Sequence, residues 1–123
     1  MAEALDCAND YVTANNVAKA WGNFGATGGT LQDSFNLDSV TDNGTGDFSP
    51  QFTRDLANAN YAVIAMINEN TIPYPDGTTG WRSVREDTDG KAVGSCNLKT
   101  FDNSGSPSVK DTDACMFVIY GDE

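Results

Sequence analysis

Histidine is absent from this chain of 123 residues. Histidine is the most frequent general acid or base in enzymes, the usual partner of a nucleophilic serine or cysteine, and the commonest metal ligand. Phosphate-binding and nucleophile motifs of the types GxxxxGK[ST], GxGxxG and GxSxG are absent as well. Two carboxylates could still hydrolyse a glycoside, but among 18 acidic residues some pair meets the required spacing by chance. We therefore expect a protein that is not an enzyme and that holds no metal and no cofactor.

Basic residues are scarce, with seven against 18 acidic ones and a net charge of −11. A field of this sign repels phosphate backbones, so the composition argues against nucleic-acid binding and favours solubility at high local protein density. Long apolar runs are also missing, because the longest, residues 114–120, is far shorter than the roughly 20 residues of a membrane span. The first residues are acidic and lack the basic region of a signal peptide. We expect a soluble chain with no membrane span.

The three cysteines, Cys7, Cys96 and Cys115, form neither a disulfide framework nor a zinc motif. Cys96 and Cys115 both fall in predicted strands and could be neighbours. Buried free thiols are the first expectation for this pair, and a single disulfide bridge is the alternative.

From residue 17 onward the sequence has the alternation and turn residues of β-structure. The patterns predict strands over residues 17–24, 34–41, 47–53, 60–67, 81–85, 92–101 and 114–120. Strand 60–67 is apolar on both faces, which predicts a central position in its sheet. These features are typical of an all-β domain, an antiparallel β-sandwich or jelly roll of about seven to eight strands.

Two local features, a turn pair and a proline within a strand, refine this prediction. Asn43-Gly44 tolerates positive φ angles and therefore predicts a tight hairpin between two of the strands. Pro50 cannot donate a hydrogen bond to a neighbouring strand, so its strand is expected at a sheet edge or at a bulge.

The first 16 residues differ from the remainder. Residues 1–16 could form a turn or two of helix, too short to be stable alone, with apolar side chains that need a partner surface. We predict that they are an N-terminal attachment arm in front of a β-sandwich domain over residues 17–123. The arm's contact residues are predicted to be Leu5, Ala8, Tyr11 and Val12.

A long loop after the central strand is the predicted binding site, because long loops on compact scaffolds often carry function. Its aromatic residues Tyr74 and Trp81 could stack on sugar rings. Nearby polar side chains could bond the hydroxyls of a glycan or receptor: Asn68, Asn70, Asp76 and Arg82. Alternatively, Trp81 begins a strand and packs into the core.

Two acidic segments, residues 87–90 and 111–113, faintly resemble calcium ligands. The spacing of an EF-hand fails because Arg85 stands where an acid is needed. The alternative is turn chemistry, in which an aspartate accepts hydrogen bonds from its own backbone.

At the hairpin the sequence resembles a known family. Residues 39–48, SVTDNGTGDF, followed by residues 52–53 and 59–63, are similar to the C-terminal β-domain family of tailed-bacteriophage tail-fibre and virion display proteins. The segments 18–24, 34–37 and 117–122 fit its opening and closing strands, so the resemblance covers about residues 17–122. Pro50 and Gly22 depart from the family, which has an ordinary strand residue and a bulkier residue there.

This resemblance implies a virion structural protein with a fibre-knob-like surface domain that attaches to a host receptor or glycan. It implies a homotrimer, bound to other virion proteins through the arm, on the virion surface (tail or capsid) after synthesis in the host cytoplasm. The alternative is a capsid or tail decoration (cement) protein without a ligand. A calcium-dependent lectin or a glycan-active enzyme is less favoured by the sequence.

Overall fold

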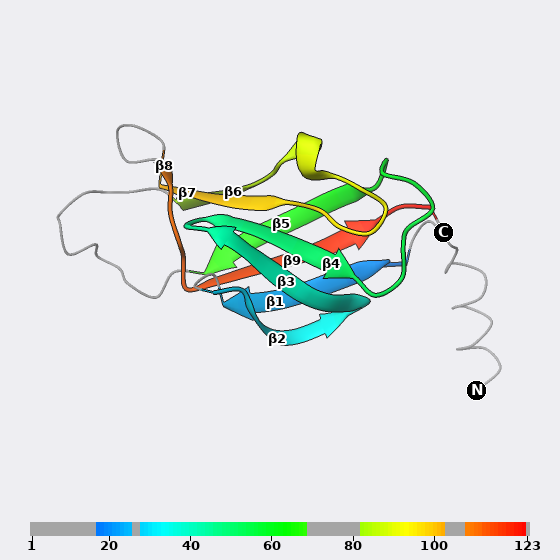
Figure 1. The fold of residues 1–123 in the computed structure, drawn as a ribbon, viewed down its shortest axis with the longest axis horizontal. Coiled ribbons are helices and arrows are strands. Elements are labelled where there is room, and N and C mark those ends of the chain that lie inside the picture. The colour runs from blue at the N-terminus through cyan, green and yellow to red at the C-terminus, as the bar shows by residue number, and fades with distance from the viewer. Residues whose placement is uncertain (1–16, 26–27, 69–81, 103–107, 123) are drawn as a thin grey trace, which may run out of the picture.

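The computed structural model describes residues 17–25, 28–68, 82–102 and 108–122 (Figure 1). Over these residues the chain forms nine strands and one short 3-10 helix, which confirms the all-β class. The elements are β1 Ala20–Gly25, β2 Thr30–Phe35, β3 Leu37–Gly44, β4 Asp47–Phe52, β5 Ala62–Asn68, β6 Arg82–Glu86, η1 Thr88–Gly90, β7 Leu98–Asp102, β8 Ser108–Val109 and β9 Ala114–Tyr120. No helix among the described residues is long and apolar enough to cross a membrane.

The strands form two antiparallel sheets that lie face to face as a β-sandwich (Figure 1). Sheet A has the order β2-β1-β9-β5, and sheet B has the order β3-β4-β7-β6, with the short β8 paired to β7. Strand β1 pairs along its whole length with β9, from Ala20 opposite Ile119 to Gly25 opposite Ala114. The first and last described strands are therefore neighbours at the centre of sheet A.

The core lies between the sheets and follows directly from strand alternation. In β4 the side chains of Phe48, Pro50 and Phe52 point inward, as the sequence pattern predicted. Phe24 of sheet A meets Phe48 of sheet B with a distance of 5.3 Å between ring centroids. Tilted aromatic pairs at this distance stabilise beyond the area that they bury, so this contact ties the two sheets together.

Residues 34–41, predicted as one strand, are divided between the two sheets. Asn36 adopts a left-handed conformation with φ of 55°, and it separates β2 in sheet A from β3 in sheet B. Asparagine is one of the few residues that tolerate this conformation at low cost. The apolar alternation runs through the corner unchanged, so it gave no signal of the break.

The predicted hairpin between β3 and β4 is present, but its turn is shifted. The two turn residues are Thr45 and Gly46 rather than Asn43 and Gly44. Gly46 has φ of 66°, and a Cβ atom there would lie 2.6 Å from the backbone nitrogen of Lys110. Only glycine fits at position 46, where the turn meets the neighbouring chain.

The strand that holds Pro50 was expected at a sheet edge or at a bulge. The edge position is wrong, because β4 lies between β3 and β7, and the irregularities of the β3–β4 pairing lie on either side of Pro50, which is opposite Val40. The ladder from β4 to β7, however, pairs only Asp47 and Phe48 and stops before Pro50. Beyond the break, the Pro50 carbonyl accepts a hydrogen bond from the Cys96 N–H at 3.2 Å. Pairing resumes at Gln51, which is bridged to Ser95, so Pro50 lies in a gap of the ladder where it contributes its carbonyl and its missing N–H is not needed.

The predicted central position of residues 60–67 is also wrong. Strand β5 is an edge strand of sheet A, paired only with β9 among the described strands. Its second apolar face, with Ile64 and Met66, is not covered by either sheet, and these side chains are 60% and 62% exposed. In this chain, a strand that is apolar on both faces therefore has one buried face and one exposed apolar face.

Cys96 and Cys115 are buried free thiols, as expected. Burial raises the pKa of each thiol from 9.0 to about 12, because a thiolate is poorly solvated in an apolar core. Cys7 lies outside the described residues.

We predict that a Cys7→Ser variant is almost inert to thiol reagents while it is folded. A pKa near 12 lowers the thiolate fraction at about pH 8 by roughly 1,000-fold relative to an ordinary thiol. Labelling with a chromogenic disulfide reagent, with and without denaturant, measures this. Rapid labelling of both thiols in the folded variant would contradict their placement in the core.

Candidate functional site

The outer face of sheet A, the face turned away from sheet B, carries five of the eight exposed large hydrophobic side chains among the described residues. We define it by seven side chains at outward positions of the four strands: Trp21, Phe35, Ile64, Met66, Met116, Val118 and Tyr120. The register places four of them in one row across the sheet, because Phe35 is opposite Trp21, Trp21 is opposite Val118, and Val118 is opposite Ile64. Met66 and Met116 form the next row with Asn23 and, at the β2 end, Asp33.

This face is uncovered, and Asp33 at its β2 edge is the one charged side chain in these two rows. Its large side chains Trp21, Phe35, Ile64, Met66 and Tyr120 are between 36% and 62% exposed. With roughly 200 Å² for each side chain, they expose about 500 Å², near the upper end for the largest apolar patch of a monomer. A shallow hollow of about 330 Å³ runs over Ile64, Met66, Met116 and Val118. Strand β5 contains no charged residue and no proline, which are common protections of an edge strand.

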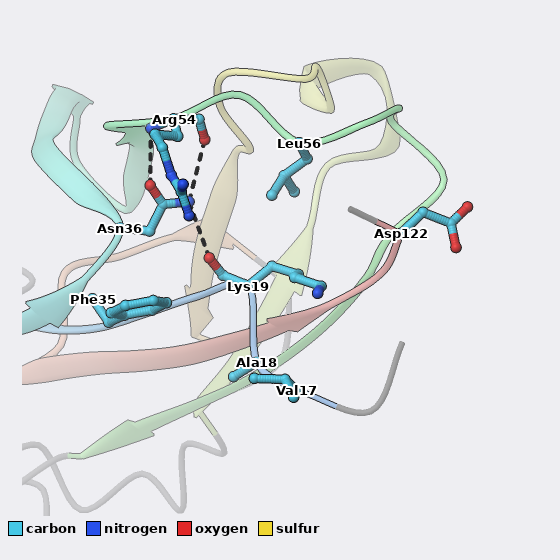
Figure 2. A pocket seen from close by; sticks show the side chains of 8 residues that line it. All are labelled: Val17, Ala18, Lys19, Phe35, Asn36, Arg54, Leu56 and Asp122. Atoms are coloured by element: carbon cyan, nitrogen blue, oxygen red, sulfur yellow. Dashed lines mark hydrogen bonds between the residues drawn. The ribbon is translucent and has the colours of Figure 1, made fainter. Parts of the chain in front are cut away.

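A second hollow lies at one end of the sandwich, where β1 begins, β2 turns into β3, and β4 ends (Figure 2). Its volume is about 440 Å³, within the range of small-ligand sites. The lining combines apolar, cationic and polar side chains: Val17, Ala18, Lys19, Phe35, Asn36, Arg54, Leu56 and Asp122. Two of the seven basic residues of the chain are therefore at this one place.

Asn36 holds this end of the sandwich together. Its Oδ1 accepts a hydrogen bond from the Arg54 N–H at 2.8 Å, and its Nδ2 donates to the Arg54 carbonyl at 3.2 Å. The same Nδ2 donates to the Lys19 carbonyl at 3.0 Å (Figure 2). The side-chain amide of Asn36 thus fixes the backbone of Lys19 and Arg54, and these three hydrogen bonds do not involve their charged groups.

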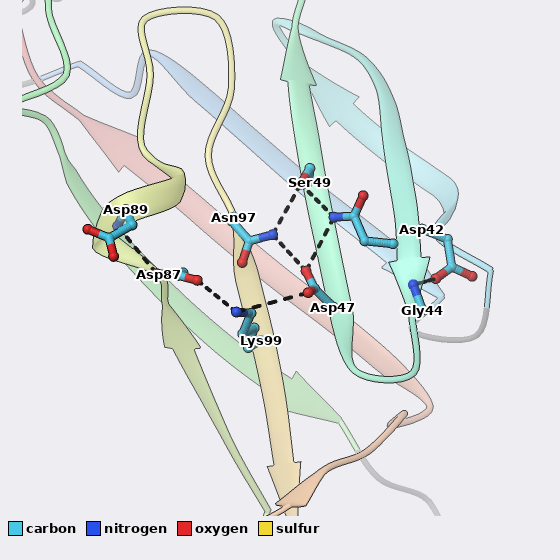
Figure 3. Close-up of polar contacts among 9 residues, drawn as sticks. Asp42, Gly44, Asp47, Ser49, Asp87, Asp89, Asn97 and Lys99 are labelled. Carbon is cyan, nitrogen blue, oxygen red and sulfur yellow. Dashed lines mark hydrogen bonds and ion pairs between the residues drawn. The ribbon is translucent and has the colours of Figure 1, made fainter.

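A polar cluster on sheet B is structural (Figure 3). Lys99 Nζ lies 2.7 Å from Asp87 Oδ2 and 4.0 Å from Asp47 Oδ2. Asn97 Nδ2 donates to Asp47 Oδ1 at 2.7 Å and to Ser49 Oγ at 3.1 Å. The lysine neutralises the acidic pair, and the amide ties β4 to the residues in front of β7.

This ion pair predicts a pH dependence of stability. The hydrogen bond from Lys99 holds the pKa of Asp87 below its ordinary value of 3.8. The charged carboxylate is therefore favoured in the folded state, and the stability that it contributes is present above pH 4 and lost as the pH falls through the folded pKa. Urea unfolding measures this. Between about pH 5 and pH 2.5, the free energy of unfolding should fall less for Lys99→Met than for the unmodified chain.

Lys110→Met is the matched control, because Lys110 is exposed and lies outside this cluster. If the two lysine variants lose the same stability over this pH range, the account of the Asp87–Lys99 pair is wrong.

The acidic segments that resembled calcium ligands make turn contacts. Asp87 Oδ1 accepts the N–H of Asp89 at 3.3 Å (Figure 3), and Asp111 Oδ1 accepts the N–H of Gly46 at 2.7 Å. In the part of the chain that the structure describes, no group of three or more acidic or cysteine side chains could hold a metal ion.

Most of the predicted loop site lies outside the described residues. These are Asn70, Tyr74, Asp76 and Trp81. The predicted arm residues also lie outside: Leu5, Ala8, Tyr11 and Val12. Two members of the site are described in part. Asn68 ends β5, and its carbonyl accepts the N–H of Asp113 at 3.1 Å. Arg82 begins β6 opposite Asp102. The loop site and the arm stay predictions.

Sequence reasoning did not identify the two surfaces described above. The outer face of sheet A had a signal in the two-sided apolarity of residues 60–67, which was interpreted as burial. The end hollow had none, because Lys19 and Arg54 are distant in sequence and meet only through the Asn36 corner. No family model, curated protein or solved structure matches the chain.

Proposed function

We propose that this protein is a non-enzymatic structural domain of a bacteriophage virion, displayed at the virion surface and assembled with copies of itself through the outer face of sheet A. The observation that carries the proposal is the uncovered surface of large apolar side chains on that face. The resemblance of residues 17–122 to tail-fibre display domains supplies the biological setting.

Assembly accounts for the exposed residues better than an isolated chain does. Ile64 and Met66 stand side by side on an edge strand and would be costly to leave in water. An interface of standard size buries about 800 Å² on each partner, and its centre is apolar with aromatic and methionine side chains. The roughly 500 Å² exposed here by Trp21, Ile64, Met66 and their neighbours would form such a centre.

A second copy is the partner that fits this face best. A partner recognised through charge would need complementary charges, and the two rows of side chains across the outer face of sheet A carry a single one, Asp33, although the chain as a whole has a charge of −11. Closed rings of identical copies bury such patches in every copy. We propose a homotrimer, with residues 1–16 as the segment that binds other virion proteins and a host glycan or receptor as the external ligand.

Mass spectrometry and cryo-EM of purified particles test this role. The proposal expects the chain in the particle, in multiples set by its symmetry, with sheet A turned toward neighbouring copies. A position on the shell would identify a capsid decoration protein, and a position at a fibre tip would identify an attachment domain. Absence of the chain from particles made by the phage that encodes it would contradict both.

A further inference from the structure

We propose that the end hollow between Arg54 and Asp122 binds a sugar that carries a carboxylate group. This inference rests on the proposed function only in that it gives a displayed domain a ligand. It concerns a site at the strand ends, whereas assembly concerns the outer face of sheet A, and Phe35 is the border between the two.

The carboxylate end of the site is formed by Arg54, whereas the ammonium group of Lys19 extends toward the side of the hollow where Asp122 lies (Figure 2). Arginine presents a planar fork of donors that matches a carboxylate in two parallel hydrogen bonds. Two cationic side chains line this hollow together with one acidic residue, Asp122, whereas Arg85 and Lys99 in the hollow on sheet B share it with two, Glu86 and Asp87.

The site is held in place before any ligand arrives. The three hydrogen bonds of Asn36 fix the backbone at Arg54 and Lys19, and they use only backbone groups of those residues. The left-handed conformation of Asn36 directs its amide into this position. A site whose framework is already ordered loses less conformational entropy on binding.

The opposite end of the hollow suits hydroxyl groups. Asp122 lies across the cavity from Arg54 (Figure 2), and its Oδ2 accepts a hydrogen bond from Asn58 Nδ2 at 3.2 Å. A carboxylate can accept further hydrogen bonds from sugar hydroxyls, while it would repel a second anionic group. Between the ends, Phe35 offers an aromatic ring that is 49% exposed, against which the apolar face of a sugar ring can lie.

The chemistry therefore selects among ligands. A simple anion such as acetate would contact Arg54 alone, and a neutral sugar would contact Phe35 and Asp122 without the ion pair. A carboxylated sugar makes all three contacts in one orientation, with its acid group toward Arg54 and its hydroxyls toward Asp122.

Nuclear magnetic resonance titration of the ¹⁵N-labelled chain tests this assignment at constant salt. The probes are methyl glucuronide, the uncharged methyl glucoside and sodium acetate. We expect the glucuronide to shift the amide signals of Lys19, Asn36 and Arg54 and to bind at least about tenfold more tightly than either other probe.

Arg54→Met should weaken glucuronide binding by about tenfold or more, because it removes the charged fork and leaves the Asn36 linkage to the Arg54 backbone intact. The matched control is Arg85→Met, which removes an arginine from sheet B and should leave the affinity unchanged. Equal affinities for glucuronide and glucoside, absence of shifts around the hollow, or an unchanged affinity in Arg54→Met would overturn the proposal. Sedimentation of the same samples reports assembly separately, so loss of binding and loss of assembly are distinguishable.

Discussion

Replacing Phe48 by alanine should lower the free energy of unfolding by about 3–5 kcal/mol, a large part of the total for a domain of this size. Phe48 is fully buried in β4, and its ring packs on Phe24 across the space between the sheets. Truncation removes the apolar surface of a whole ring and leaves a cavity that the two sheets cannot close without moving together. Urea unfolding followed by tryptophan fluorescence measures the change.

Val109→Ala is the control, because Val109 is 43% exposed on the short strand β8. Its truncation should cost less than about 1 kcal/mol. If Phe48→Ala were no more destabilising than Val109→Ala, the sheets would not be packed through their aromatic rings.

The double substitution Ile64→Glu, Met66→Glu should weaken self-association by at least about 100-fold. Both side chains lie at outward positions of β5, and in the assembled protein each new carboxylate would be buried without a partner. Burying an unpaired charge costs several kcal/mol, and each copy already carries a charge of −11. Sedimentation velocity over a range of concentrations measures the loss.

A matched control adds the same two charges to sheet B. Ser39→Glu, Thr41→Glu changes two exposed residues of β3. This variant should associate like the unmodified chain, and circular dichroism should show the same β-structure in both variants. If the two double variants behave alike, contact through the outer face of sheet A is excluded.

The local parts of the fold could be predicted from the sequence. Alternation and turn residues located most of the strands, because successive side chains of a strand point to opposite faces. The hairpin of β3 and β4 was found to within two residues, since its turn needs glycine at positive φ. The sparse cysteines indicated buried free thiols, and the structure has them at Cys96 and Cys115.

The features that failed depend on long-range arrangement. The break at Asn36 comes from the crossing between sheets, which a regular alternation does not reveal. The edge position of β5 depends on which strands pair with it, and residues that are apolar on both faces are equally compatible with burial and with an exposed interface. The hollow around Arg54 is built from strand ends that are far apart in the chain. A local sequence pattern cannot show that these strand ends lie together in the fold.

Oxidation footprinting of Met66 tests the central claim, that the outer face of sheet A is covered by another copy of the chain. Met66 is 62% exposed on that face in the single chain, so its thioether should oxidise readily in the monomer. We predict that oxidation slows by about fivefold or more when the unmodified chain is concentrated enough to assemble, and that the Ile64→Glu variant shows no such protection. Equal oxidation of Met66 in dilute and concentrated samples of the unmodified chain would contradict the account.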